Sequence, residues 1–262
     1  MMLKFIENIG HITLNALTSV YEILAFSLIC IGHMFSPGSY NPAMRMVLIK
    51  QIYFTTIGAF PIVIITATIF GSIIIGVVIT LANEFNLLEQ MGKIIITFVF
   101  DEFSPFVTAL IVTLRSASAV NTEISLMKVN KELNFLKQYK IDLIDYLFLP
   151  RIIAGMLSVI SLSILFSIIM ISSGYLYVLF YINMDINNYL LLLMNALEIK
   201  DFLIALIKSG ILGFIMMLIQ INSGQHTGDS YASIPISVSK GLVQLFIAIF
   251  FIEVISLILQ LI

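Results

Sequence analysis

The segment QIYFTTIGAFPIVIITATIFGSIIIGVVITLAN, residues 51–83, contains no charged residue in 33 positions. As an α-helix it would approach about 50 Å in length, beyond the roughly 30 Å of a hydrocarbon core. Such a helix must tilt, kink near Pro61 or project out of the membrane. Continuous apolar runs are typical of transmembrane helices, whereas a transmembrane β-barrel shows short alternating segments. The segment therefore indicates a helical integral membrane protein.

Four further apolar runs predict that the chain crosses the membrane five times. They lie at about residues 94–114, 146–180, 202–221 and 242–262. The 262-residue chain is 60% hydrophobic and 11% charged, which agrees with this class. No internal repeat or linker divides it, so we expect one domain over residues 1–262. Its expected parts are an N-terminal segment (residues 1–50), a transmembrane core (residues 51–262) and, within the core, a short cytoplasmic helix (residues 121–140).

The N-terminal segment predicts a helix that lies in the membrane interface. Its apolar run, residues 23–31, is nine residues long and is flanked by Glu22 and His33. A span needs about 20 residues. We therefore expect an interfacial helix over residues 14–35 and a turn at residues 36–38, with a sixth span as the alternative. The single cysteine, Cys30, excludes an internal disulfide and is expected to be a packing residue.

The distribution of Lys and Arg predicts the orientation of the chain. With the N-terminus in the cytoplasm, ten of the 13 basic residues lie at or near the cytoplasmic side. The other three are Lys93, Lys200 and Lys208. Cytoplasmic loops carry an excess of Lys and Arg, so this orientation is favoured. Five spans then place the C-terminus on the opposite side.

Ionisable residues gather between Asp101 and Arg151, where charge beside or inside a bilayer is costly and marks a candidate functional region. Glu102 and Arg115 are 13 residues apart, about 20 Å along one helix and on roughly opposite faces. Each therefore needs a partner on another helix, a water-filled cavity or a bound headgroup. A structural bond between helices and a role in a cavity are both open for Glu102, and Arg115 could instead reach lipid phosphates.

Residues 121–140 predict an amphipathic helix on the cytoplasmic side. Asn121 or Thr122 can cap its start, and Lys137 and Lys140 complement its end. Apolar residues at steps of three and four leave the lysines on the other flank. These apolar residues are Leu126, Val129, Leu133 and Leu136. The helix either rests on anionic headgroups or docks a soluble partner, and its composition does not separate the two.

Two patterns on the first span concern packing and a cavity. Pairs of small residues four apart, Ala67/Gly71 and Ser72/Gly76, let another helix approach closely. An apolar stripe at helical spacing could line a cavity, or could merely pack against the fifth span or face lipid. The stripe consists of Ile74, Val78, Leu81 and Phe85.

The sequence argues against catalysis by this chain. It has no Gly-x-x-x-x-Gly-Lys-(Ser/Thr) phosphate loop, so ATP hydrolysis would need another chain. The histidines, His11, His33 and His226, have no metal-ligand spacing to one another, and no metal site is predicted. Asp229 and Ser230 lie near His226 in sequence, but catalytic triads converge from separate elements, so this is a weak indication of a hydrolase.

A set of motifs at matching spacing resembles the MlaE (YrbE) family, permease subunits of lipid-transporting ABC systems that work with MCE proteins. The family pattern reads Glu-Leu-Gly-Pro, Gly-Arg-x-Gly-x-Ala, Ala-Glu-(Leu/Ile)-Gly-x-Met and Pro-Arg. The chain departs from it at Phe103-Ser104, which replaces Leu-Gly, and at Lys131-Glu132, which replaces Glu-Gln. The matching stretches are Asp101-Glu102-Phe103-Ser104-Pro105, Arg115-Ser116-Ala117-Ser118-Ala119, Thr122-Glu123-Ile124-Ser125-Leu126-Met127 and Pro150-Arg151.

The resemblance implies an all-α fold of five transmembrane helices, with two copies of the chain around a lipid cavity. Residues 121–140 would be the coupling helix for a P-loop ATPase subunit, which would hold ATP and Mg²⁺ while this chain binds no cofactor. Further implied partners are a periplasmic MCE-domain protein, a small cytoplasmic accessory subunit and phospholipid, but no nucleic acid. The implied location is a bacterial inner membrane, with the N-terminus in the cytoplasm and the C-terminus in the periplasm.

The implied function is movement of phospholipid between inner and outer membranes. The cavity candidates are the apolar stripe and Glu102, and the motif residues are Pro105, Arg115, Glu123, Pro150 and Arg151. The candidates for ATPase coupling are Leu126, Val129, Lys131, Glu132, Leu133 and Leu136. The alternative is a self-sufficient channel or secondary carrier that uses Glu102 and Arg115, although carriers usually show an internal duplication that is not seen here.

Overall fold

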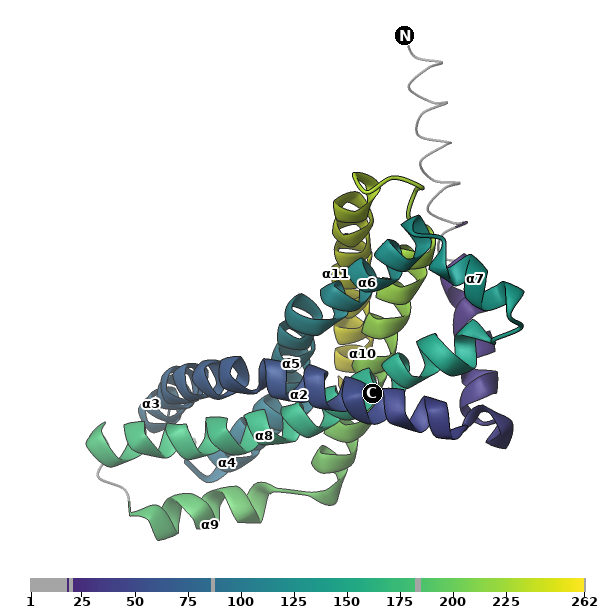
Figure 1. The fold of residues 1–262 in the computed structure, drawn as a ribbon. Helices are drawn as coiled ribbons and strands as arrows, with labels where there is room; N and C mark the ends of the chain where they lie inside the picture. Colours follow the sequence, from purple (N-terminus) through teal and green to yellow (C-terminus); the bar gives the residue numbers. More distant parts are fainter. Residues whose placement is uncertain (1–17, 19–20, 86–87, 182–184, 262) are drawn as a thin grey trace, which may run out of the picture.

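A computed structural model describes residues 18, 21–85, 88–181 and 185–261, and this part of the chain is helical without a β-strand (Figure 1). The helix of residues Tyr21–Met34 comes first. The ordered elements that follow are η1 (Pro37–Ser39), α2 (Pro42–Phe70), η2 (Gly71–Ile75), α3 (Gly76–Glu84), α4 (Leu88–Ile96), η3 (Thr97–Phe103), α5 (Ser104–Val112), η4 (Thr113–Ala117), α6 (Ser118–Val129), α7 (Glu132–Gln138), η5 (Ile144–Phe148), α8 (Leu149–Tyr181), α9 (Ile186–Ala196), α10 (Ile199–Gln225) and α11 (Ser233–Leu261).

Five helical stretches are long and apolar enough to cross a membrane, which confirms the predicted fold class. They are Pro42–Ala82, Gln90–Val129, Ile144–Phe180, Ile199–Gln225 and Ser233–Gln260. Each overlaps one predicted span, and most begin or end beyond it. The reason is that hydropathy detects only the apolar part of a helix, while the hydrogen-bonded backbone continues into polar residues.

The N-terminal helix agrees in part with the interfacial prediction. Its described apolar stretch, Tyr21–Met34, is shorter than a span, and residues 14–17, 19 and 20 of the predicted helix lie outside the described residues. The predicted turn is present as the short helix η1. Cys30 is buried in the core, and this burial raises the pKa of its thiol to about 12. Such a thiol stays protonated at neutral pH and serves packing, as predicted.

Wide π-helical turns, η2 to η4, interrupt the first two spans, and η5 begins the third. In a π turn each N–H bonds the carbonyl five residues back, so one extra residue is fitted into the helix. The turn η3 directly precedes Pro105 in the second span. A proline lacks an N–H group, and its ring clashes with the carbonyl four residues earlier. The wider turn lets one continuous helix carry Asp101, Glu102 and Pro105 through the membrane-length region.

Small residues bring the first and third spans into close contact, as the sequence predicts. A Cβ atom added to Gly71 would collide with the side chain of Ser173 and the backbone of Met170 on α8. A Cβ atom on Gly76 would lie 2.8 Å from the ring of Tyr177. The glycines are therefore needed for the packing of α2, η2 and α3 along α8.

We expect Gly71→Ala to destabilise the folded chain by about 1–3 kcal/mol, because one added methyl overpacks this contact. Thermal unfolding in mild detergent, followed by size-exclusion chromatography, measures the change. Gly32→Ala is the matched control, since a Cβ atom at Gly32 meets nothing within 4 Å. Equal unfolding temperatures for the two variants would show that η2 and α8 can move apart without loss of stability.

Helix α11 is the least enclosed of the five spans. Only 11% of its apolar window is buried, against 33% to 56% in the other four. It lies along α10 (Figure 1) and leaves most of its circumference to lipid or to another protein.

Candidate functional site

Polar side chains from three spans meet in the membrane-length region. Glu102 comes from η3, Lys208 from α10, and Glu253 and Gln260 from α11. The Nζ atom of Lys208 lies 2.5 Å from Oε2 of Glu102 and 2.7 Å from Oε2 of Glu253. Gln260 donates a hydrogen bond from Nε2 to Oε1 of Glu102 at 2.7 Å. Of the possibilities left open for Glu102, a bond between helices is therefore present.

This Glu102–Lys208–Glu253 cluster contains two carboxylates and one ammonium group. The Lys208 side chain is 5% exposed, and Oε1 of Glu253 is buried without a hydrogen-bond partner among the described residues. Asp101, the next residue in the chain, is 3% exposed and likewise has an unpartnered buried oxygen, Oδ1. Buried acceptors of this kind are costly unless a proton, water or ligand donor satisfies them. The cluster can therefore bind a proton or a hydrogen-bond donor.

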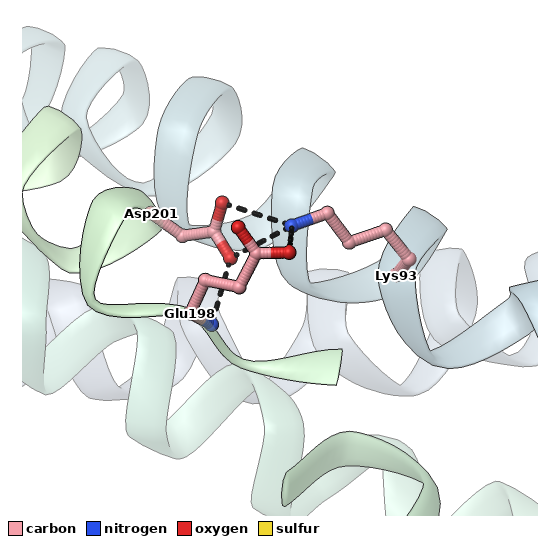
Figure 2. Close-up of polar contacts among 3 residues, drawn as sticks. All are labelled: Lys93, Glu198 and Asp201. Carbon is pink, nitrogen blue, oxygen red and sulfur yellow. Dashed lines mark hydrogen bonds and ion pairs between the residues drawn. The ribbon is translucent and has the colours of Figure 1, made fainter. Parts of the chain in front are cut away.

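A second ion-pair group fastens the start of α10 to α4 (Figure 2). Lys93 lies 3.0 Å from Oε1 of Glu198 and 3.2 Å from Oδ2 of Asp201. Asp201 also accepts a hydrogen bond from the backbone N–H of Glu198, so the two acidic residues cap the helix. The Lys93 side chain is 46% exposed, so this pair orients α10 more than it stabilises the fold.

Three motif residues meet around the junction of α2, α6 and α8. Arg115 donates from Nε to the carbonyl oxygen of Gly58 at 2.9 Å and, with Glu123, lines a pocket of about 320 Å³. Arg151 is 3% exposed and pairs with Glu123 at 2.7 Å, and it also donates to the carbonyl of Leu147. The partner that Arg115 needs is thus a backbone carbonyl on another helix. The Glu123–Arg151 pair ties α6 to α8.

The two motif prolines, Pro105 and Pro150, are both buried and are the second residues of α5 and α8. Neither proline begins a helix, because η3 and η5 pass into α5 and α8 without a break. Each proline therefore lies where a wide turn passes into a regular helix, and the widened backbone can accommodate its missing N–H and its ring.

The predicted single helix over residues 121–140 is wrong, because the structure has two helices, α6 and α7, joined at Asn130 and Lys131. Lys131 has a φ of 62°, a left-handed conformation that ends α6 and turns the chain. Asn121 does not cap a helix start, since α6 continues the second span without a break. Its buried amide instead donates to Oε1 of Gln220 on α10 at 2.7 Å. We call residues 118–138 the elbow.

The elbow exposes a different apolar surface from the predicted one. Leu126 and Phe135 are 41% and 58% exposed, whereas Leu133 is 7% exposed and belongs to the core of the chain. Leu136 also packs against that core, and Val129 is half-buried. The charged pair Lys131 and Glu132 is exposed at the bend. Leu133 in particular is not available to a partner, because its side chain faces the chain's own helices.

The predicted cavity stripe on the first span becomes more exposed toward its C-terminal end. Ile74 and Val78 pack partly against the core, while Leu81 and Phe85 are 47% and 68% exposed. The π turn η2 contains Ile74, so the helical register changes within the stripe. The role of the stripe in a lipid cavity stays a prediction, and any such cavity would need a surface outside this chain to close it.

Two groupings were missed because their members are far apart in sequence. Lys208 was counted only as a basic residue, although a lone lysine inside an apolar span could have signalled a buried partner. Nδ1 of His33 lies 2.7 Å from Oδ1 of Asp145, and Asp142 completes a trio of potential ligand atoms within 4.8 Å of one another. Their spacing in the sequence did not predict this trio, because His33 is more than 100 residues from both aspartates. By contrast, His226 contacts the carbonyl of Asn222 rather than a catalytic partner.

The structure is that of a multi-pass membrane protein. It has five membrane-length helices, ion pairs between them and an exposed elbow that continues one span. The profile of the family described as Permease MlaE matches residues 48–259 of this sequence. The chain belongs to this permease family. Family membership makes it a transporter subunit of the ABC type and does not favour the self-sufficient channel or carrier.

Individual relatives agree with this assignment. A "Probable ABC transporter permease protein" of Rickettsia bellii is 26% identical over 228 residues, which cover 87% of this chain and 86% of the relative. The "Intermembrane phospholipid transport system permease protein MlaE" of Haemophilus influenzae is 30% identical over 129 residues, 48% of this chain and 49% of the relative. The chloroplastic "Protein TRIGALACTOSYLDIACYLGLYCEROL 1" of Arabidopsis thaliana is 29% identical over 169 residues, 64% of this chain and 48% of the relative.

Proposed function

We propose that this chain is the membrane subunit of an ABC transporter that moves phospholipid between the inner and outer membranes of a bacterium. A separate P-loop ATPase would supply the energy and hold ATP and Mg²⁺. The name of the Haemophilus relative supports phospholipid as the cargo. The proposed orientation keeps the elbow and the N-terminus in the cytoplasm and the C-terminus in the periplasm, in agreement with the distribution of Lys and Arg.

The observation that carries the proposal is the continuous helical stretch Gln90–Val129. It contains Glu102 of the intramembrane cluster and passes directly into α6 of the exposed elbow. Its far end is held to α8 by the Glu123–Arg151 pair. A partner that moves the elbow would therefore also move the cluster, because both belong to one helix. This is the mechanical link that a transporter without its own ATPase requires.

The proposed assembly contains a second copy of the chain, an MCE-domain protein in the periplasm and a small cytoplasmic accessory subunit. The weakly enclosed helix α11 offers a surface for the second copy, since most of its apolar window is uncovered in the single chain. A lipid cavity between two copies would also cover the exposed residues of the apolar stripe, Leu81 and Phe85.

We expect Glu102→Gln to reduce ATP-driven phospholipid transfer at least about tenfold while the chain stays folded. Lys208 keeps its second carboxylate, Glu253, so no buried ammonium is left unpaired. Transfer of a fluorescent phospholipid between vesicles containing the complex and acceptor vesicles measures the effect. Glu253→Gln is the matched control, because it removes the other carboxylate and leaves Glu102 paired. Full transfer by folded Glu102→Gln would reject a role for this carboxylate in lipid handling.

A further inference from the structure

A second group of buried polar side chains lies away from the intramembrane cluster, at the end of α10 and α11 that contacts the elbow. Ser223, Thr227 and Ser237 are between 3% and 8% exposed. Ser223 and Ser237 hydrogen-bond each other, and Thr227 lies 2.6 Å from Ser125 of the elbow. These three residues form one wall of a pocket of about 250 Å³ between the N-terminal helix, α10 and α11. Neither the cluster at Glu102 nor the coupling surface uses this pocket.

The pocket contains polar groups without partners inside the described chain. Asn222 lines it and is 8% exposed, yet its side-chain amide makes no hydrogen bond to any described residue. Lys240 of α11 also lines it and forms no ion pair with the described residues. The amide atoms of Asn222 are not among the fully enclosed atoms, so the amide faces open space, and Lys240 is exposed. Asn222 and Lys240 therefore present two available donors to the same pocket.

The remaining charges of the pocket define the chemistry of the ligand. Glu22 of the N-terminal helix lines the wall and lies 4.0 Å from Nε2 of His226. An ammonium and a carboxylate thus border one pocket without pairing with each other. A phosphate would accept from Lys240 and Asn222, and a primary amine on the same ligand would donate to Glu22. A zwitterionic headgroup of the phosphoethanolamine type carries both groups.

An open, shallow surface on α11 continues from the pocket. Pocket and surface share Ile236, Lys240 and Gln244, and the surface adds Pro235, Ser239 and Val243. Beyond Val243 the exposed apolar side chains Ile247 and Phe250 lie four and seven residues further on, on the same helix face. A polar chamber that opens onto an apolar helix face matches a whole lipid better than a soluble phosphate.

We infer that this pocket binds the headgroup of a phosphatidylethanolamine molecule from the elbow-side leaflet, with an acyl chain along α11. The inference rests on the proposed function and adds a second lipid site to it. The site is coupled to the elbow, because Lys128 donates to the carbonyl of Gln225 at 2.6 Å and Tyr231 donates to Asn130 at 2.8 Å. Motion of the elbow would thus reach the α10–α11 loop that closes the pocket.

The test measures lipid retained by the full-length chain. The purified, detergent-washed protein is incubated with equal amounts of phosphatidylethanolamine and phosphatidylglycerol, and bound lipid is counted by native mass spectrometry. We expect one phosphatidylethanolamine per chain. Lys240→Ala or Asn222→Leu should lower its affinity about tenfold, while Lys240→Arg keeps it. Glu22→Gln should remove the preference over phosphatidylglycerol. Lys50→Ala, an exposed lysine outside the pocket, is the matched control.

Several results would overturn the inference. Unchanged lipid retention in folded Lys240→Ala is one. Because Lys240 is exposed, this variant is expected to fold normally. Displacement of the lipid by equimolar glycerophosphoethanolamine or inorganic phosphate would instead identify a site for a soluble phosphate. ATP-driven transfer is measured separately. If the complex transfers phospholipid but Lys240→Ala does not change lipid retention, only this site is rejected. If the chain retains phosphatidylethanolamine selectively but the complex transfers no phospholipid, the proposed function is rejected.

Discussion

Lys208→Met should destabilise the folded chain by about 3–5 kcal/mol, because it leaves two carboxylates in the membrane-length region without their cation. Glu102 and Glu253 both depend on Lys208, which is almost completely buried. A methionine of similar length fills the space but donates no hydrogen bond. The unfolding temperature in mild detergent, read from the remaining monodisperse protein after heating, reports the loss. Lys200→Met, an exposed lysine on the same helix, is the control.

The electrostatic origin of this loss has its own test. Combining Lys208→Met with Glu102→Gln and Glu253→Gln removes all three charges and keeps similar side-chain volumes. Replacing a buried ionic group by neutral residues of similar shape is often neutral or stabilising, so the triple variant should recover most of the lost stability. If the triple variant is as unstable as Lys208→Met alone, packing of the lysine stem, not charge, holds these three helices together.

Leu126→Asp or Phe135→Asp should release the ATPase from the complex, while Lys137→Ala should leave it bound. An apolar side chain buried in a partner's groove typically contributes about 2–4 kcal/mol, whereas an exposed lysine at a rim contributes under about 1 kcal/mol. Leu126 and Phe135 are the large apolar residues of the elbow that the single chain leaves exposed, and Tyr139, just beyond the elbow, is exposed as well. Affinity purification from cells that express the whole complex, with the ATPase quantified by immunoblot, measures the effect.

Leu133→Asp distinguishes docking from folding of the elbow. Leu133 is packed inside the chain, so aspartate there should lower the stability of the protein itself and not only its affinity for the ATPase. If the lysine variant releases the ATPase and the Leu126 and Phe135 variants retain it, the docking face is misassigned. If none of these changes affects a co-purifying subunit, the elbow rests on the membrane surface instead.

The sequence was sufficient for the spans and for the small-residue contacts, because both depend on local composition. The 33-residue uncharged run predicts a membrane helix, and the pairs Ala67/Gly71 and Ser72/Gly76 have the four-residue spacing of a helix face. The partner of Glu102 could not be found in this way, since Lys208 lies 106 residues away and only the packing of α10 brings it near.

The elbow shows a different limit of sequence reasoning. Periodicity identified Leu126 and Leu133 as apolar positions of one helix, but it cannot tell whether such a position faces the chain's own core or a partner. The sequence has no glycine at the bend that would predict it. A lysine, Lys131, adopts the left-handed conformation there. A non-glycine residue in that region is uncommon, so the continuous helix was the natural expectation.

The π turns make the faces of the second span sensitive to where a residue is deleted. Each residue of an α-helix advances the direction of its side chain by about 100°, and a π turn accommodates one residue more than a regular turn. A chain with one residue deleted within η3 could close a regular helix there, and α4 would keep its orientation relative to Arg115 and the elbow. A residue deleted where the helix has no spare residue would instead rotate everything before it by about 100°. Lys93, on α4, would then turn away from Glu198 and Asp201, although no residue of that ion-pair group had been changed.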